Sequence, residues 1–143
     1  MHDRMDPTMA ESKIRVETTG APTPMTAFSQ GVKKGGFVSV SGQGPQDPAT
    51  GEYLHPGDVT LQTIRTLDNV RAIVEAAGGT FDDVLSLRVF LTERRDFAEM
   101  NAAYAEYIRA NVPSGVYPTR TTVFVELPNE AMLVEIDALA VVG

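Results

Sequence analysis

Two charged residues interrupt apolar, strand-like stretches in the C-terminal third of the chain. Arg120 follows Pro118 at the start of one stretch, and a guanidinium offers a planar fork of donors that matches a carboxylate. Glu135 interrupts residues 133–139, where strand alternation places it on one face with Asp137. These residues could bind an anion and handle a proton. From the residues alone, a water-facing arginine is the commoner case, and a solvent-facing glutamate is as common as a functional one.

Other kinds of catalytic site find little support. The two histidines, His2 and His55, have no partner at metal-ligand spacing, and we expect both to be exposed loop residues. Residues 41–44 lack the Gly-x-Ser-x-Gly pattern of a nucleophile elbow, and the glycine pairs lack the order of a phosphate-binding loop. Cysteine is absent, which excludes thiolate nucleophiles and sulfur-ligated metals. These observations argue against a metal site, a nucleophile elbow and a phosphate-binding loop.

The composition predicts an ordinary globular protein of one domain. The 143 residues are 43% hydrophobic and 22% charged. A net charge of −7 disfavours binding to nucleic acid or to an anionic membrane. No signal sequence or membrane-length apolar run is visible, so we expect a cytoplasmic protein. Residues 1–12 are polar and aperiodic and predict a mobile arm, which leaves residues 13–143 as the domain.

Periodicity and turn residues predict the elements that must position Arg120 and Glu135. We expect strands at residues 13–18, 27–32, 37–41, 84–91, 118–126 and 132–142, with the second and third forming a hairpin, and helices from Asp58 to Ala77 and from Asp96 to Asn111. The apolar residues of the first helix lie mostly on one stripe: Leu61, Ile64, Leu67, Ile73 and Val74. Those of the second recur at helical spacing and form a stripe that should be core: Phe97, Met100, Tyr104, Tyr107 and Ile108.

This order of elements predicts an α+β fold with a mixed sheet. Both helices can lie on one face, because crossovers between parallel strands are right-handed. The opposite face would then be bare. Since the strands are strongly apolar, oligomerisation is the simplest way to cover it.

Several separated motifs resemble the reactive intermediate deaminase family, also called RidA or YjgF. They are Phe28-Ser29-Gln30-Gly31-Val32, Val40-Ser41-Gly42-Gln43, Leu67-Asp68-Asn69-Val70, Ala76-Ala77-Gly78, Tyr117-Pro118-Thr119-Arg120 and Val134-Glu135-Ile136-Asp137-Ala138. The resemblance runs in order from about residue 27 to residue 142. It implies a chorismate-mutase-like protomer and a homotrimer with sites in the clefts between subunits. It also implies hydrolysis of amino-acid-derived enamines and imines, such as 2-aminoacrylate and 2-iminobutanoate, to 2-oxoacids and ammonia, a reaction that needs no metal and no organic cofactor.

The resemblance also assigns roles to individual residues. Arg120 matches the arginine that binds the substrate carboxylate, and Glu135 matches the glutamate that holds the attacking water. Further predicted contacts to a small imino or oxo acid are Ser41 and Gly42 in a pocket-lining loop, Phe28, Asn101 and Thr122. Asn101 is equally well explained as a helix-surface amide or a structural hydrogen-bonding group.

One position departs from the family, and two other functions stay open. At the two positions where archetypal deaminases look like Pro-Tyr, this chain has Ala27-Phe28. It therefore lacks a tyrosine hydroxyl that could form a hydrogen bond to substrate or water. A non-catalytic trimer that binds 2-oxoacids would use Arg120 without turnover. An endoribonuclease or translation inhibitor is a label that some members of the family carry, but the net acidity and the lack of a histidine pair argue against it.

Overall fold

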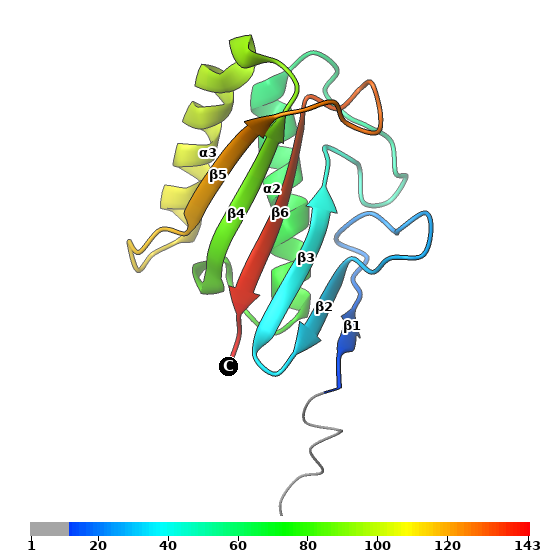
Figure 1. Ribbon diagram of the computed structural model, residues 1–143, viewed down its shortest axis with the longest axis vertical. Helices are drawn as coiled ribbons and strands as arrows, with labels where there is room; N and C mark the ends of the chain where they lie inside the picture. Colours follow the sequence, from blue (N-terminus) through cyan, green and yellow to red (C-terminus); the bar gives the residue numbers. More distant parts are fainter. Residues whose placement is uncertain (1–11) are drawn as a thin grey trace, which may run out of the picture.

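A six-stranded mixed sheet carries two helices on one of its faces (Figure 1). The computed structural model describes residues 12–143; the predicted arm, residues 1–12, lies outside the described residues apart from Ser12. The strands are β1 (Ile14–Val16), β2 (Gly31–Lys34), β3 (Phe37–Gln43), β4 (Val84–Leu91), β5 (Thr119–Phe124) and β6 (Val134–Val141). Their order is β1-β2-β3-β6-β4-β5, and β4 and β5 are parallel while the other neighbours are antiparallel. The predicted α+β class is confirmed.

The helices are α2 (Val59–Ala76) and α3 (Phe97–Asn111), each close to its predicted bounds. Asp58 caps α2 as predicted, because its Oδ1 accepts a 3.0 Å hydrogen bond from the Leu61 amide. Asp96 does not cap α3 with its side chain. A short 3₁₀ turn, Arg94–Asp96, leads directly into the helix, so Asp96 already has helical dihedral angles.

Two residues of the predicted apolar stripes are on the surface, and one of them, Phe97, was predicted as core. Leu61 is 42% exposed and Phe97 is 38% exposed. Each lies in the first turn of its helix, and Phe97 packs beside Phe124 of β5, with ring centroids 6.4 Å apart. The rest of the two stripes is buried or half-buried.

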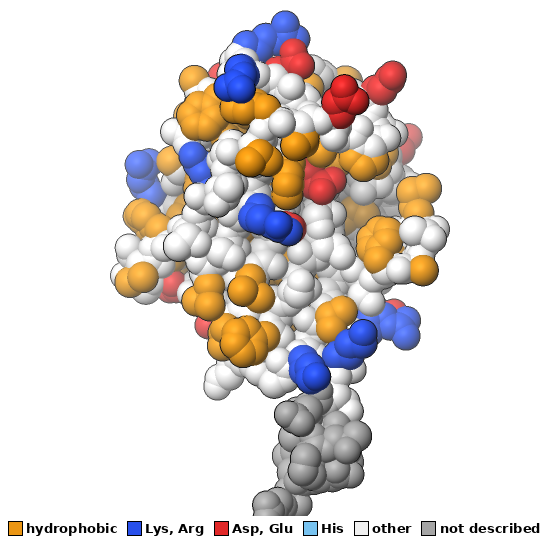
Figure 2. All heavy atoms as spheres, in the orientation of Figure 1, with side chains coloured by type: hydrophobic (Ala, Val, Ile, Leu, Met, Phe, Trp, Pro, Cys, Tyr) orange, Lys and Arg blue, Asp and Glu red, His pale blue; other side chains and the backbone are white. Residues whose placement is uncertain are grey.

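The predicted bare face of the sheet is present in the protomer. Figure 1 places both helices behind the sheet, and Figure 2 looks onto the uncovered face, where apolar side chains stand among charged ones. Exposed apolar residues on this face include Phe37, Val123, Leu139 and Val141. Within residues 12–143, no helix has the length and hydropathy to cross a membrane.

Candidate active site

Arg120 lies on the helix-covered side of the sheet. It pairs with Leu87 of β4, which in turn pairs with Ala138 of β6, and both of these neighbours are buried beneath the helices. Residues opposite one another in paired strands project to the same face. The Arg120 side chain therefore rises from the edge strand β5 towards α3.

Residues of α3 hold the Arg120 guanidinium in place. Its Nη1 donates a 2.8 Å hydrogen bond to Asn101 Oδ1, and its Cζ lies 4.7 Å from the centroid of the Tyr104 ring and 5.9 Å from that of Phe97. Burial raises the pKa of Tyr104, and the neighbouring Arg120 partly opposes this. Over the described part of the chain, Arg120 has no ion-pair partner. The guanidinium is thus oriented and keeps donors for an anion.

Thr122 lies two residues after Arg120 on the same face of β5. Its Oγ1 is buried and has no hydrogen-bond partner among residues 12–143. An unpaired buried hydroxyl costs free energy, but this oxygen has almost no exposed surface in the protomer that a ligand at Arg120 could contact. The contact between Thr122 and substrate stays a prediction.

Glu135 projects from the open face of the sheet. It pairs with Phe90 of β4, while Val134 and Ile136 are buried on the helix side, as alternation predicted. A Cβ on Gly42 would stand 2.8 Å from Glu135 Cδ, so the lack of a side chain at Gly42 makes room for the carboxylate. Burial raises the pKa of the half-buried Glu135, and the charge of Asp137 raises it further.

Glu135 lines a cavity of about 230 Å³. Its lining includes Gly42, Phe28, Tyr53, Met132 and Pro128. Gly42, which the sequence predicts as a pocket residue, is among the residues that line this cavity, and both Ser41 and Gly42 belong to β3 and not to a loop. The Ser41 hydroxyl donates a 2.6 Å hydrogen bond to the Ser29 carbonyl, and Ser41 is not among the residues lining this cavity.

Three buried amide side chains shape the cavity, and their role was not predicted. Gln30 donates to the carbonyls of residues 18, 21 and 22; Gln62 donates to those of residues 54, 55 and 131; and Asn69 donates to those of residues 44 and 46. These bonds fix the loops that carry much of the lining. A signal was available, because Gln62 and Asn69 stand on the apolar stripe of α2, where a buried amide must have partners.

Within one protomer, Arg120 and Glu135 lie apart from each other. They project from opposite faces of the sheet, and β4 separates their strands. The registry also offsets them by three residues, or about 10 Å along the strands at the usual rise. Asn101 and Thr122 lie with Arg120, whereas Phe28 and Gly42 lie with Glu135. Each protomer therefore carries two separate candidate clusters, which we name the Arg120 half-site and the Glu135 half-site.

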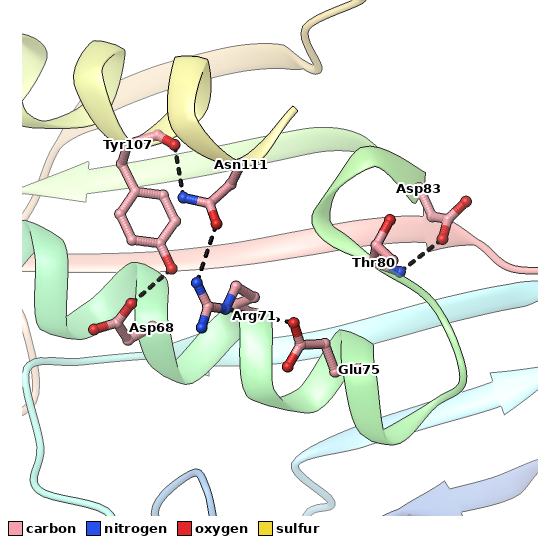
Figure 3. A network of polar contacts seen from close by, with 7 residues as sticks. All are labelled: Asp68, Arg71, Glu75, Thr80, Asp83, Tyr107 and Asn111. Atoms are coloured by element: carbon pink, nitrogen blue, oxygen red, sulfur yellow. Dashed lines mark hydrogen bonds and ion pairs between the residues drawn. The ribbon is translucent and has the colours of Figure 1, made fainter. Parts of the chain in front are cut away.

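A polar network links α3 to α2 (Figure 3). The Tyr107 hydroxyl donates to Asp68 Oδ1 at 2.7 Å, and Arg71 Nη1 donates to Asn111 Oδ1 at 3.0 Å. Burial raises the pKa of Tyr107, as does its bond to Asp68. Because Asn101 and Tyr104 belong to the same helix, this network helps to fix the surroundings of Arg120.

The described residues contain no group of three or more histidine, cysteine, aspartate or glutamate side chains placed to hold a metal ion. His55 stands in the loop before α2, with a positive φ of 56°, and His2 lies outside the described residues. The chemistry available at the half-sites is therefore that of a guanidinium, a carboxylate, hydroxyls and amides.

Comparison with known proteins gives matches that span both half-sites. Residues 18–142 match the family model described as Endoribonuclease L-PSP. The chain is 42% identical to a RutC family protein of Pyrococcus horikoshii, over 86% of this chain and 93% of the relative. It is 38% identical to the 2-iminobutanoate/2-iminopropanoate deaminase of Escherichia coli, over 88% and 95%. The crystal structure of Escherichia coli TdcF with bound serine has a TM-score of 0.83 and 40% identity, covering 91% of this chain and 99% of that one.

Proposed function

The chain belongs to the RidA/YjgF family of reactive intermediate deaminases, and on this premise we propose that it hydrolyses amino-acid-derived enamines and imines to 2-oxoacids and ammonia. The observation that carries the proposal is the Arg120 guanidinium, held by Asn101 and Tyr104 without an acidic partner among the described residues. A 2-imino acid presents a carboxylate next to the reacting carbon, so an oriented cation also orients that carbon. TdcF, whose structure holds serine, binds a molecule with the same carboxylate and α-nitrogen arrangement.

Glu135 supplies the proton transfers in this proposal. Its carboxylate takes a proton from water as the water oxygen bonds to the iminium carbon, and the C=N π electrons move to nitrogen. The protonated Glu135 then gives that proton to the nitrogen. As the C–N bond breaks and ammonia leaves, the hydroxyl gives its proton to Glu135 and becomes the carbonyl of the 2-oxoacid. The ammonia then accepts this proton from Glu135 and is released as ammonium. Burial raises the pKa of Glu135 towards neutral pH, and a carboxylate with a raised pKa is a stronger base.

The proposal requires two copies of the chain, because one imino acid cannot reach both half-sites of a single protomer. The Arg120 half-site lies at the β5 edge, and the Glu135 half-site faces the uncovered side of the sheet. A head-to-tail contact between different surfaces can join them and closes into a ring. We propose the homotrimer implied by the family resemblance, with Arg120 of one copy facing Glu135 of the next.

The test is to measure 2-oxoacid and ammonia release from imines generated in situ by an amino-acid oxidase. We expect Arg120→Ala to lower kcat/KM by about 100-fold or more, because a desolvated charge partner is lost. Glu135→Gln should lower kcat by about 100-fold or more, since it removes the proton acceptor.

Two variants serve as matched controls. Arg94→Ala removes another guanidinium stacked on an aromatic ring, 4.5 Å from the Phe124 centroid, and Glu126→Gln removes an exposed carboxylate outside the Glu135 cavity. Both should retain wild-type rates. Wild-type imine loss no faster than in buffer would contradict the proposal, and tight binding of 2-oxobutanoate with no turnover would favour the non-catalytic alternative. RNA cleavage that Glu135→Gln abolishes would favour the ribonuclease alternative.

A further inference from the structure

The Glu135 cavity offers a substrate more apolar than polar surface, and its polar lining residues are Thr23, Gln43, Gln46, Tyr53 and Glu135. Apart from glycine, the apolar part of its lining consists of Pro22, Pro24, Met25, Phe28, Pro128 and Met132. The cavity volume of about 230 Å³ far exceeds the ~30 Å³ that one water occupies. The space is therefore larger than an attacking water needs, and it can accept a substrate side chain.

The charges of the cavity oppose an acidic side chain. Among the described residues that line it, Glu135 is the one ionisable carboxylate, and no lysine, arginine or histidine is present. Each of the two lining amides uses one of its two N–H donors within the protein, because Gln43 Nε2 donates to the Ser41 carbonyl and Gln46 Nε2 to the Gly51 carbonyl, both at 3.1 Å. A second carboxylate would lose its hydration and would gain Glu135 as a neighbour of like charge.

Phe28 forms an apolar rim that is held in place. It is 52% exposed, and its ring offers no hydrogen bond to a polar group. Gln30, two residues later, anchors the segment by accepting from the Thr18 amide and donating to the carbonyls of Thr18, Ala21 and Pro22. The rim is thus preorganised for contact with hydrocarbon.

We propose that the Glu135 cavity receives the side chain of the imino acid and that Phe28 makes it selective for large apolar side chains over small or acidic ones. The substrate class is then the imines of leucine, methionine and phenylalanine. This inference rests on the proposed deaminase function for turnover, but the same selectivity must govern binding of the corresponding 2-oxoacids.

The experiment compares kcat/KM for imines of leucine, alanine and glutamate and, separately, calorimetric Kd values for 4-methyl-2-oxopentanoate, 2-oxopropanoate and 2-oxoglutarate. We expect the leucine-derived imine to have a kcat/KM about 10-fold or more above that of the alanine-derived imine, because apolar pockets discriminate by side-chain size. For the same reason the Kd of 4-methyl-2-oxopentanoate should be about 10-fold or more below that of 2-oxopropanoate. The glutamate-derived compound should rank last. Equal values across the series, or glutamate first, would overturn the inference.

Two substitutions at Phe28 separate apolar contact from charge. Phe28→Ala should lower the ratio of kcat/KM for the leucine-derived imine to that for the alanine-derived imine several-fold. Phe28→Arg should raise kcat/KM for the glutamate-derived imine by about 10-fold, because it adds the cation that the cavity lining lacks. Leu61→Ala, at an exposed position on α2, is the matched control and should leave the ratios unchanged. If the protein binds the 2-oxoacids with the predicted selectivity but does not hydrolyse the imines, the proposed deaminase function is wrong and this inference about the cavity still holds.

Discussion

At the scale of single residues, the environment of Glu135 decides what its carboxylate can do. Gly42 leaves space beside it, the cavity removes part of its hydration, and Asp137 stands two residues along on the same face. Asp137 is itself bound by Arg88, whose Nη2 donates to Asp137 Oδ2 at 2.6 Å and whose Nε contacts both oxygens. The ion pair moderates the repulsion that Glu135 experiences.

This arrangement predicts the pH dependence of the reaction. Glu135 works as a carboxylate, so activity falls as the pH drops through its pKa. Because the pKa of Glu135 is raised, this loss of activity occurs at a pH above the ordinary glutamate pKa of about 4.3. Asp137→Asn removes a like charge and frees the Arg88 cation, and both changes lower the pKa of Glu135. The acid limb of the kcat/KM profile should therefore move to lower pH.

Profiles of wild type, Asp137→Asn and Glu126→Gln check this prediction. The last of these removes an exposed carboxylate that does not line the Glu135 cavity, so its acid limb should coincide with that of wild type. An acid limb that stays in place in Asp137→Asn would exclude the proposed electrostatic link.

At the scale of elements, α3 carries the residues that orient Arg120, and α2 holds α3 in position. Phe97, Asn101 and Tyr104 follow one another at helical spacing and so form one face towards β5. The contacts from Tyr107 and Asn111 fasten a later part of the same helix to α2 (Figure 3). The guanidinium is thus positioned by packing that extends through both helices.

Tyr107→Phe tests how much this attachment contributes to stability. The substitution removes a hydrogen bond to a charged acceptor, Asp68, and should lower the free energy of unfolding by about 1.5 kcal/mol. Chemical denaturation followed by circular dichroism measures the change. Tyr117→Phe removes a hydroxyl from a tyrosine that is 52% exposed, and its unfolding midpoint should match wild type. Equal midpoints for all three proteins would show that the bond between the helices is energetically neutral.

At the scale of the whole molecule, the two half-sites predict that inactive variants can complement each other. In a ring of mixed subunits, an Arg120→Ala copy still provides Glu135, and a Glu135→Gln copy still provides Arg120. Random mixing should restore roughly a quarter of the sites, because each site draws one residue from each of two neighbours. Activity after co-expression of the two differently tagged variants measures this.

The control for complementation is Arg120→Ala mixed with the double variant Arg120→Ala/Glu135→Gln, in which no site can regain both residues. Its rate should stay at the level of the single variants. A mixture of the two single variants that is no more active than this control would place the whole reaction within one protomer.

Short-range patterns already contained a large part of this description. Alternation placed Glu135 and Asp137 on one face, the strand at residues 84–91 coincides with β4, and Asp58 caps α2 as predicted. These features depend on neighbouring residues, so they are visible in one sequence. The motifs around Arg120 and Glu135 also indicated the family, to which the comparisons assign the chain.

Tertiary structure decided which residues act together. Arg120 lies on the helix side because β5 pairs in parallel with β4 in a particular register, and that register depends on residues about 30 positions apart in sequence. The same long-range packing exposes Phe97 beside Arg120, although helical spacing predicted Phe97 as core, and it supplies the distant carbonyl partners of the buried Gln62 and Asn69. The sequence by itself therefore indicated Arg120 and Glu135 as a pair, whereas only the assembled sheet places them on opposite faces, because sheet pairing is non-local.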